Sequence, residues 1–179
     1  MMNTAAAKDE RPNAAKFATL VVGLGSAHGD DQFGWQVVGH LAAEIADPSV
    51  SMRAARSPAE LLDWMEGFER LIVCDACQSM GSPGAIRVWR WPDVPRDALR
   101  SAGTHDLGLA AALELAEQLR HLPAETLIWC VEIETPRPGE AVSARVEVAA
   151  IRAARMIRLG LRASRLDDKL GLPVALKTT

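Results

Sequence analysis

Three short apolar runs decide the fold: residues 18–23 (ATLVVG), residues 70–75 (RLIVCD) and residues 126–133 (TLIWCVEI). Continuous apolar runs of this length are typical of strands that are buried on both faces, as in a parallel sheet. Segments with helical spacing of apolar residues separate or follow them, at residues 32–46, 105–119 and 143–159. Strands that alternate with helices predict an α/β protein, a three-layer α/β/α sandwich around a central, mostly parallel sheet.

Shorter elements are expected between these segments. Residues 50–54 and 85–91 are predicted to form further strands. Ser57, Pro58 and Glu60 have the spacing of a capping box with proline in the first helical position, which predicts a helix from there to about residue 65.

Length and composition indicate one domain. The chain has 179 residues, and we expect a flexible arm at 1–17, a single domain at 18–160 and a peripheral tail at 161–179. The net charge of −3 argues against a nucleic-acid partner. No apolar run approaches the roughly 18 residues of a membrane span. Three cysteines without a disulfide framework, and no secretory signal, favour a reducing cytoplasm.

Two carboxylate positions and one histidine are the candidates for chemistry. Asp30 and Asp31 follow the first strand, Asp75 ends the second strong strand, and His105 opens a predicted helix. In a parallel sheet all of them belong to the carboxyl edge, where ligands of open α/β sheets bind. Two carboxylates and an imidazole suit nickel or zinc, or a hydrolysis driven by carboxylates. The structural alternative is that Asp30 and Asp31 complement a helix N-terminus, that Asp75 bonds a neighbouring loop and that His105 lies beside a cap.

Other familiar motifs are incomplete. Gly23-Leu24-Gly25 lacks the third glycine and the acidic residue of a dinucleotide fingerprint, and no lysine follows it as in a P-loop. Cys74 and Cys77 form a CxxC pair, for which we expect packing rather than redox chemistry, with Cys74 in the core and Cys77 on a loop. Ser26 lies outside any nucleophile elbow.

Four separated segments together resemble the hydrogenase maturation proteases, the endopeptidases that trim the C-terminus of the large subunit of nickel–iron hydrogenases. The opening segment contains Gly23-Leu24-Gly25-Ser26 and Gly29-Asp30-Asp31-Gln32-Phe33-Gly34, and the second is the strand that ends in Asp75-Ala76. The third is Thr104-His105-Asp106-Leu107-Gly108-Leu109, and the closing strand, loop and helix begin at Val131-Glu132-Ile133-Glu134. The resemblance covers about residues 20–159, in the same order.

The resemblance implies an α/β sandwich and an endopeptidase. It implies that Asp31, Asp75 and His105 bind nickel, with Asp31 and Asp75 also catalytic. The substrate would be a large-subunit precursor that already carries nickel, so that the free enzyme would hold no metal of its own, and we expect a monomer. Ser26 replaces the usual asparagine and the first loop is one residue shorter. Asp30 is therefore an alternative to Asp31, and His28 a further candidate ligand. A nickel-binding chaperone and a small-molecule hydrolase are the alternative functions.

Overall fold

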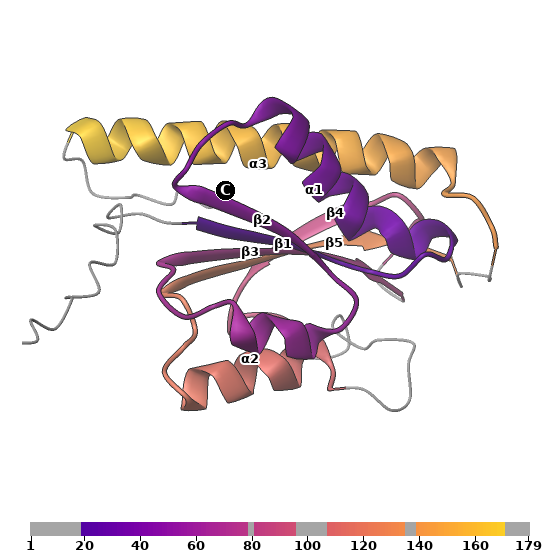
Figure 1. Ribbon diagram of the computed structural model, residues 1–179. Helices are drawn as coiled ribbons and strands as arrows, with labels where there is room; N and C mark the ends of the chain where they lie inside the picture. The colour runs from indigo at the N-terminus through magenta and orange to yellow at the C-terminus, as the bar shows by residue number, and fades with distance from the viewer. Residues whose placement is uncertain (1–18, 79–80, 96–106, 135–138, 171–179) are drawn as a thin grey trace, which may run out of the picture.

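The computed structural model describes residues 19–78, 81–95, 107–134 and 139–170, and its strands form one five-stranded sheet (Figure 1). The order across the sheet is β2-β1-β3-β5-β4. Strands β2, β1, β3 and β5 are parallel, and β4 pairs with β5 in the antiparallel sense at one edge. The bounds are β1 Thr19–Leu24, β2 Val50–Ala55, β3 Arg70–Cys77, β4 Ile86–Arg90 and β5 Glu125–Glu132.

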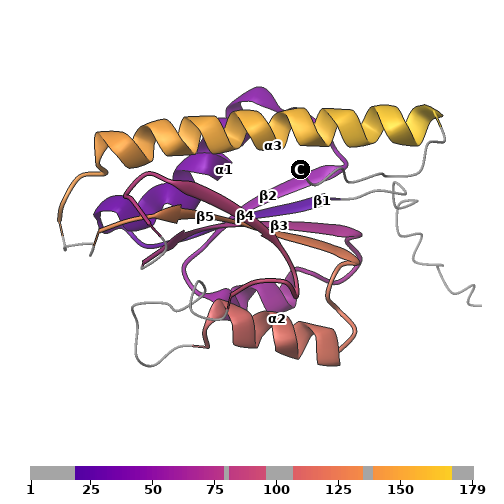
Figure 2. The ribbon, with the colours of Figure 1, turned by 180° about the vertical axis from the view of Figure 1, so that it is seen from behind.

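Helices cover both faces of the sheet (Figures 1 and 2). Helices α1 (Phe33–Glu44) and α3 (Ala144–Leu170) lie side by side on one face. The 3₁₀ helix η2 (Pro58–Asp63) and α2 (Leu109–Gln118) lie on the other. A second 3₁₀ helix, η1 (Gly29–Gln32), joins β1 to α1. The three-layer sandwich predicted from the sequence is therefore confirmed.

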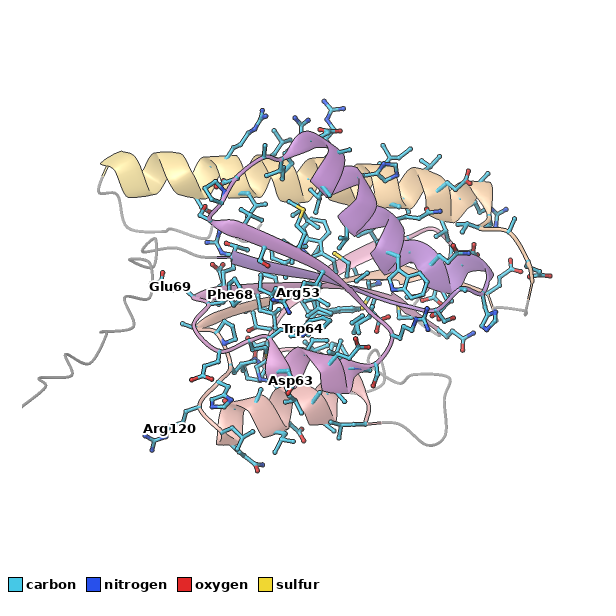
Figure 3. The ribbon with its side chains drawn as sticks, in the orientation of Figure 1. Arg53, Asp63, Trp64, Phe68, Glu69 and Arg120 are labelled. Atoms are coloured by element: carbon cyan, nitrogen blue, oxygen red, sulfur yellow. The ribbon has the colours of Figure 1, made fainter. Side chains whose placement is uncertain are left out.

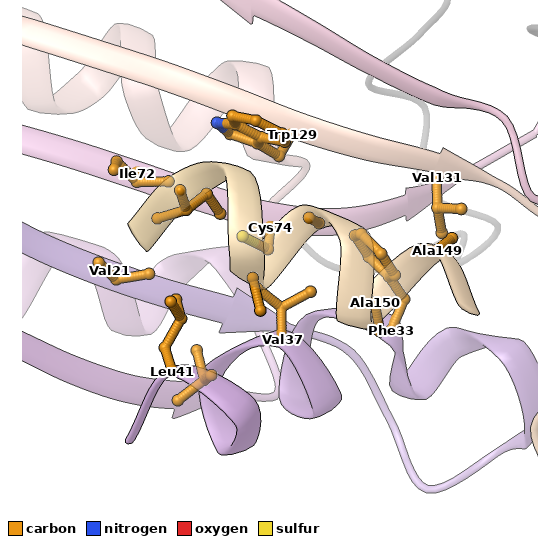
Figure 4. Close-up of a cluster of buried hydrophobic side chains, with 14 of the residues drawn as sticks. Val21, Phe33, Val37, Leu41, Ile72, Cys74, Trp129, Val131, Ala149 and Ala150 are labelled. Carbon is orange, nitrogen blue, oxygen red and sulfur yellow. The ribbon is translucent and has the colours of Figure 1, made fainter. Parts of the chain in front are cut away.

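The apolar runs are continuous because the central strands feed two cores. In β3, Ile72 and Cys74 pack toward α1 and α3, whereas Leu71 and Val73 pack toward η2 and α2. Figure 4 shows the first of these cores, with Phe33 and Trp129 among its largest side chains. Successive side chains of a strand point to opposite faces, so a strand covered on both sides has no position left for a solvent-facing residue.

The predicted capping box is present at the start of η2. The Ser57 side chain accepts a hydrogen bond from the backbone N–H of Ala59 at 3.3 Å, and Glu60 Oε1 accepts one from the Ser57 N–H at 3.0 Å. The segment is a single stretch of 3₁₀ helix that ends at Asp63. The cap was readable from sequence because it depends on side chains within one turn.

Helix α3 is longer than the sequence predicted. The end expected at residue 159 is wrong, because the helix continues through residue 160 to Leu170 and the Leu161 side chain packs into the core beside α1. Arg158 of this helix forms an ion pair with Glu44 of α1 at 3.0 Å. The boundary expected at residue 160 falls inside this helix, while the division into arm, domain and tail stays a prediction.

No helix in the described part of the chain combines the length and the apolar character that a membrane crossing needs.

Candidate active site

The carboxyl edge of the sheet is shaped by two glycines that let backbone approach backbone. A Cβ added at Gly34 would lie 2.2 Å from the carbonyl oxygen of Leu24 and 2.3 Å from that of Cys74. A Cβ at Gly25 would lie 2.1 Å from the carbonyl oxygen of Asp31. Contacts this close are open only to glycine. They seat the start of α1 on β1 and β3, and the backbone of Asp31 in η1 against Gly25, directly after β1.

Asp75 is the acid whose properties this packing changes most. It lies half-buried in β3, and its Oδ1 accepts a hydrogen bond from the Ala76 N–H at 2.9 Å. Burial and then the negative charge of Asp31 raise the pKa of Asp75 to about 7, against the smaller opposing effect of the Ala76 hydrogen bond. The structure therefore brings Asp31 and Asp75 together, as the sequence predicted. Strand β3 continues to Cys77, so Asp75 does not end it.

Asp30 and His28, the two alternative ligands, have other surroundings. The Asp30 carboxylate accepts hydrogen bonds from the N–H of Ser143 at 2.6 Å and from its hydroxyl at 3.0 Å. It thus faces the start of α3 and not Asp75. His28 is exposed and precedes η1 without a capping hydrogen bond from its side chain. Of the two adjacent aspartates, Asp31 is the one that interacts with Asp75.

His105 lies outside the described residues. The helix expected to open at His105 and Asp106 begins instead at Leu109, with Gly108 as its N-cap and Leu107 before it, so that expected start is wrong. Helix α2 is followed along the chain by β5, which begins at the amino edge of the sheet. The C-terminus of α2 therefore lies toward the amino edge, and its N-terminus is directed toward the carboxyl edge (Figure 1). Within the described ranges, no three His, Cys, Asp or Glu side chains are close enough together to hold a metal ion.

A buried carboxylate that the sequence analysis missed, Glu132, lies on the same face of the sheet as Asp75. Glu132 is only 5% exposed, and its Oε2 accepts a hydrogen bond from the Cys77 thiol at 3.8 Å. Both residues alternate with side chains that pack toward α1 and α3, so both point to the opposite face, toward α2. The sequence did contain a signal for this burial. Val131 and Ile133 flank Glu132 in a strand with two buried faces, so the alternation of side chains places Glu132 on a buried face.

The cysteines are packed thiols. Cys77 is buried within β3, so the expected loop position is wrong, whereas Cys74 is buried as expected. Cys130 is buried in β5. Burial raises the pKa of Cys74 far above its usual value, and the charge of Asp75 adds to this. The pKa of Cys130 is raised by a hydrogen bond with Cys77 and by burial. Cys74 and Cys130 therefore stay protonated at neutral pH, which makes them poor nucleophiles.

The hydrogenase maturation protease family matches residues 36–158, more than half of the chain. The chain belongs to this family, whose members are peptidases. The matched range contains Asp75 and the position of His105, whereas Asp31 lies just before it.

Solved structures share the fold over most of the chain. The hydrogenase maturating endopeptidase HybD from Escherichia coli is 25% identical, with a TM-score of 0.72, over 83% of this chain and 94% of that one. An endopeptidase from Escherichia coli solved in solution is 26% identical with a TM-score of 0.74 over the same shares.

Two curated relatives are the hydrogenase expression/formation proteins HupD of Rhizobium leguminosarum bv. viciae and Rhodobacter capsulatus. Both are 29% identical to this chain, over 132 and 149 residues. The match spans 71% of this chain and 65% of the Rhizobium protein, slightly under two thirds, and 78% of this chain and 70% of the Rhodobacter protein.

Proposed function

We propose that this protein is an endopeptidase that removes the C-terminal extension of a nickel-loaded [NiFe]-hydrogenase large-subunit precursor. The observation that carries the proposal is the pairing of Asp31 with Asp75 at the carboxyl edge of the sheet, in a chain of the maturation protease family. The reducing cytoplasm is the proposed compartment, and the three buried free thiols suit it.

Asp75 supplies the acid–base chemistry that peptide hydrolysis requires. A carboxyl group with a pKa of about 7 both accepts and donates a proton at neutral pH, whereas an ordinary aspartate is almost always ionised there. In its ionised form Asp75 can take a proton from the attacking water, and in its protonated form it can return one to the leaving amine. The chemistry is thus that of an aspartyl-type peptidase.

Nickel enters this scheme as part of the substrate. Asp31 and Asp75 offer carboxylate oxygens from two adjacent elements, and we propose that His105 adds an imidazole nitrogen, because it stands four residues before the helix that begins at this edge. Three such ligands hold a nickel ion weakly unless the precursor contributes its own. The arrangement therefore favours a precursor that already carries the metal.

The test compares nickel-loaded and metal-free large-subunit precursor, with intact mass as the readout. Wild-type protein should shorten the nickel-loaded precursor and leave the metal-free one intact, and Asp75→Asn should shorten neither. Asp63→Asn is the matched control, because Asp63 is an exposed carboxylate at the end of η2 and is labelled in Figure 3. It should behave like wild type.

The alternatives give different products. Binding of the precursor's nickel without shortening would identify a chaperone, and turnover of ester or amide probes without nickel would identify a small-molecule hydrolase. Equal cleavage of both precursors would contradict the metal requirement and leave a peptidase that reads sequence alone.

A further inference from the structure

Asp30 makes a contact that the proposed chemistry does not use. Its two carboxylate oxygens accept hydrogen bonds from one residue, Ser143, which is 113 positions further along the chain. Ser143 directly precedes α3, and its carbonyl oxygen accepts hydrogen bonds from the N–H groups of Val146 and Glu147 at 3.0 Å each. Asp30 therefore fastens η1 to the first turn of the longest helix.

A backbone hydrogen bond also ties the same two segments. The N–H of Gly29 donates to the carbonyl oxygen of Glu140 at 3.1 Å. The start of η1 is thus held to residues 140–143 by backbone and side chain together, while Gly25 and Gly34 hold its other side against the strands. Asp31 lies between these two sets of contacts.

We propose that Asp30 is a positioning residue, which holds η1 in the orientation that directs Asp31 toward Asp75. This inference rests on the proposed function for its kinetic consequence, but its structural part does not. The two adjacent carboxylates thus have different roles: Asp30 is anchored to the start of α3, and Asp31 is directed toward the site.

The need for such an anchor follows from the size of η1. A 3₁₀ helix of four residues has little stability of its own, since its hydrogen bonds have poor geometry and its nucleation is costly. Its orientation must come from tertiary contacts. Hydrogen bonds to an ionised carboxylate are about twice as strong as neutral ones, and two bonds to one partner also fix direction.

The chain contains a matched control at the opposite edge of the sheet. Asp47 Oδ1 accepts hydrogen bonds from the N–H of Ser49 at 3.0 Å and from its hydroxyl at 2.8 Å, in the turn before β2. The donor groups, the N–H and the hydroxyl of one serine, are of the same kinds as those that bind Asp30. A substitution at Asp47 therefore removes comparable bonds without touching η1.

The first measurement needs no activity. Amide hydrogen exchange of residues 29–32 is followed in the full-length, metal-free proteins Asp30→Ala, Ser143→Ala and Asp47→Ala. The first two variants should speed exchange in η1 at least fivefold, and Asp47→Ala should leave it at the wild-type rate. Unchanged exchange in Asp30→Ala would overturn the anchoring of η1.

The second measurement is steady-state cleavage of the nickel-loaded precursor. Asp30→Ala should raise KM about tenfold, because a misdirected Asp31 meets the substrate's nickel poorly, and Asp30→Asn should recover part of this, since the amide oxygen still accepts one bond. Mere loss of folded protein would lower the apparent kcat and leave KM unchanged. An unaltered KM in Asp30→Ala, or an equal rise in Asp47→Ala, would refute the positioning role.

The two failures are distinguishable. A wild-type protein that does not cleave the nickel-loaded precursor refutes the proposed function, and the exchange rates of η1 then decide the anchor alone. A wild-type protein that cleaves normally, with faster exchange in Asp30→Ala and an unaltered KM, refutes the kinetic role only.

Discussion

Carboxylates at the two ends of the parallel strands, the amino edge and the carboxyl edge of the sheet, have opposite electrostatic surroundings. At the amino edge, Glu125 at the start of β5 is bound on one side by Arg70 of β3 and on the other by Arg90 of β4. Arg70 also donates to the hydroxyl of Ser164 on α3 at 2.9 Å. At the carboxyl edge, the charge of Asp31 raises the pKa of Asp75, and neither residue forms an ion pair with a described residue.

The difference separates a structural carboxylate from a chemical one. The charge of Glu125 is balanced by two arginines, so it stabilises the contact of β5 with β3 and β4. Burial raises the pKa of Asp75, and its neighbour Asp31, negative where Glu125 has positive ones, raises it further. Carboxylates that a fold leaves uncompensated at an edge where ligands bind are candidates for function.

The largest effect is expected where the carboxyl edge depends on backbone contact. Gly34→Ala should destabilise the protein by about 3 kcal/mol or more, because the new methyl group would meet two carbonyl oxygens that cannot move apart. Urea unfolding measures the loss. Gly39→Ala in the same helix is the control, since nothing lies within 4 Å of the added Cβ, and it should stabilise by about 0.5–1 kcal/mol. Equal behaviour of the two variants would show that the close approach at Gly34 is unimportant.

The next effect is a pH dependence of stability that belongs to Asp75. Its pKa is higher in the folded than in the unfolded protein, so the native state binds more protons between about pH 4 and pH 7, and its carboxyl lowers stability as the pH rises through that range. Asp75→Asn should therefore gain stability relative to wild type on going from pH 4 to pH 8, by on the order of 2 kcal/mol after solvent screening. Unfolding curves at both pH values give the difference. A constant gap would mean that the pKa of Asp75 is ordinary.

At the amino edge, replacing a carboxylate by its amide should lower stability, in contrast to the gain expected for Asp75→Asn as the pH rises. Glu125→Gln leaves two arginines without their shared anion, and we expect a loss of about 1–2 kcal/mol at neutral pH. Cleavage of the nickel-loaded precursor by the folded variant should match wild type, because Glu125 stands at the far end of β5 from the site. A strong loss of cleavage would mean that the two edges are coupled.

The smallest effect is expected for the more exposed arginine of that group. The Arg90 side chain is 40% exposed and its nitrogen lies 3.2 Å from Glu125 Oε1, so Arg90→Gln should cost about 0.5 kcal/mol. The cost should fall further at 1 M salt, since exposed ion pairs are screened. A loss as large as that of Glu125→Gln would assign the stabilisation to Arg90 and not to Arg70.

Much of the fold follows from local patterns. The strands β1, β3 and β5 are continuous apolar runs, and the cap of η2 is contained within Ser57–Glu60, so both could be predicted from neighbouring residues alone. The end of α3 could not, because the helix is prolonged by the packing of Leu161 against α1, a contact between segments far apart in the chain.

The sequence by itself determined that Asp31 and Asp75 would share one edge, since the carboxyl ends of parallel strands meet there. Only the tertiary structure showed that Asp31 interacts with Asp75 while Asp30 binds Ser143. It also decided that Glu132 is buried beside Cys77. The physical reason is that adjacent residues of one type look alike in sequence. The direction in which each side chain points, and therefore which groups lie near its charge, can be set by a segment more than a hundred residues away in the chain.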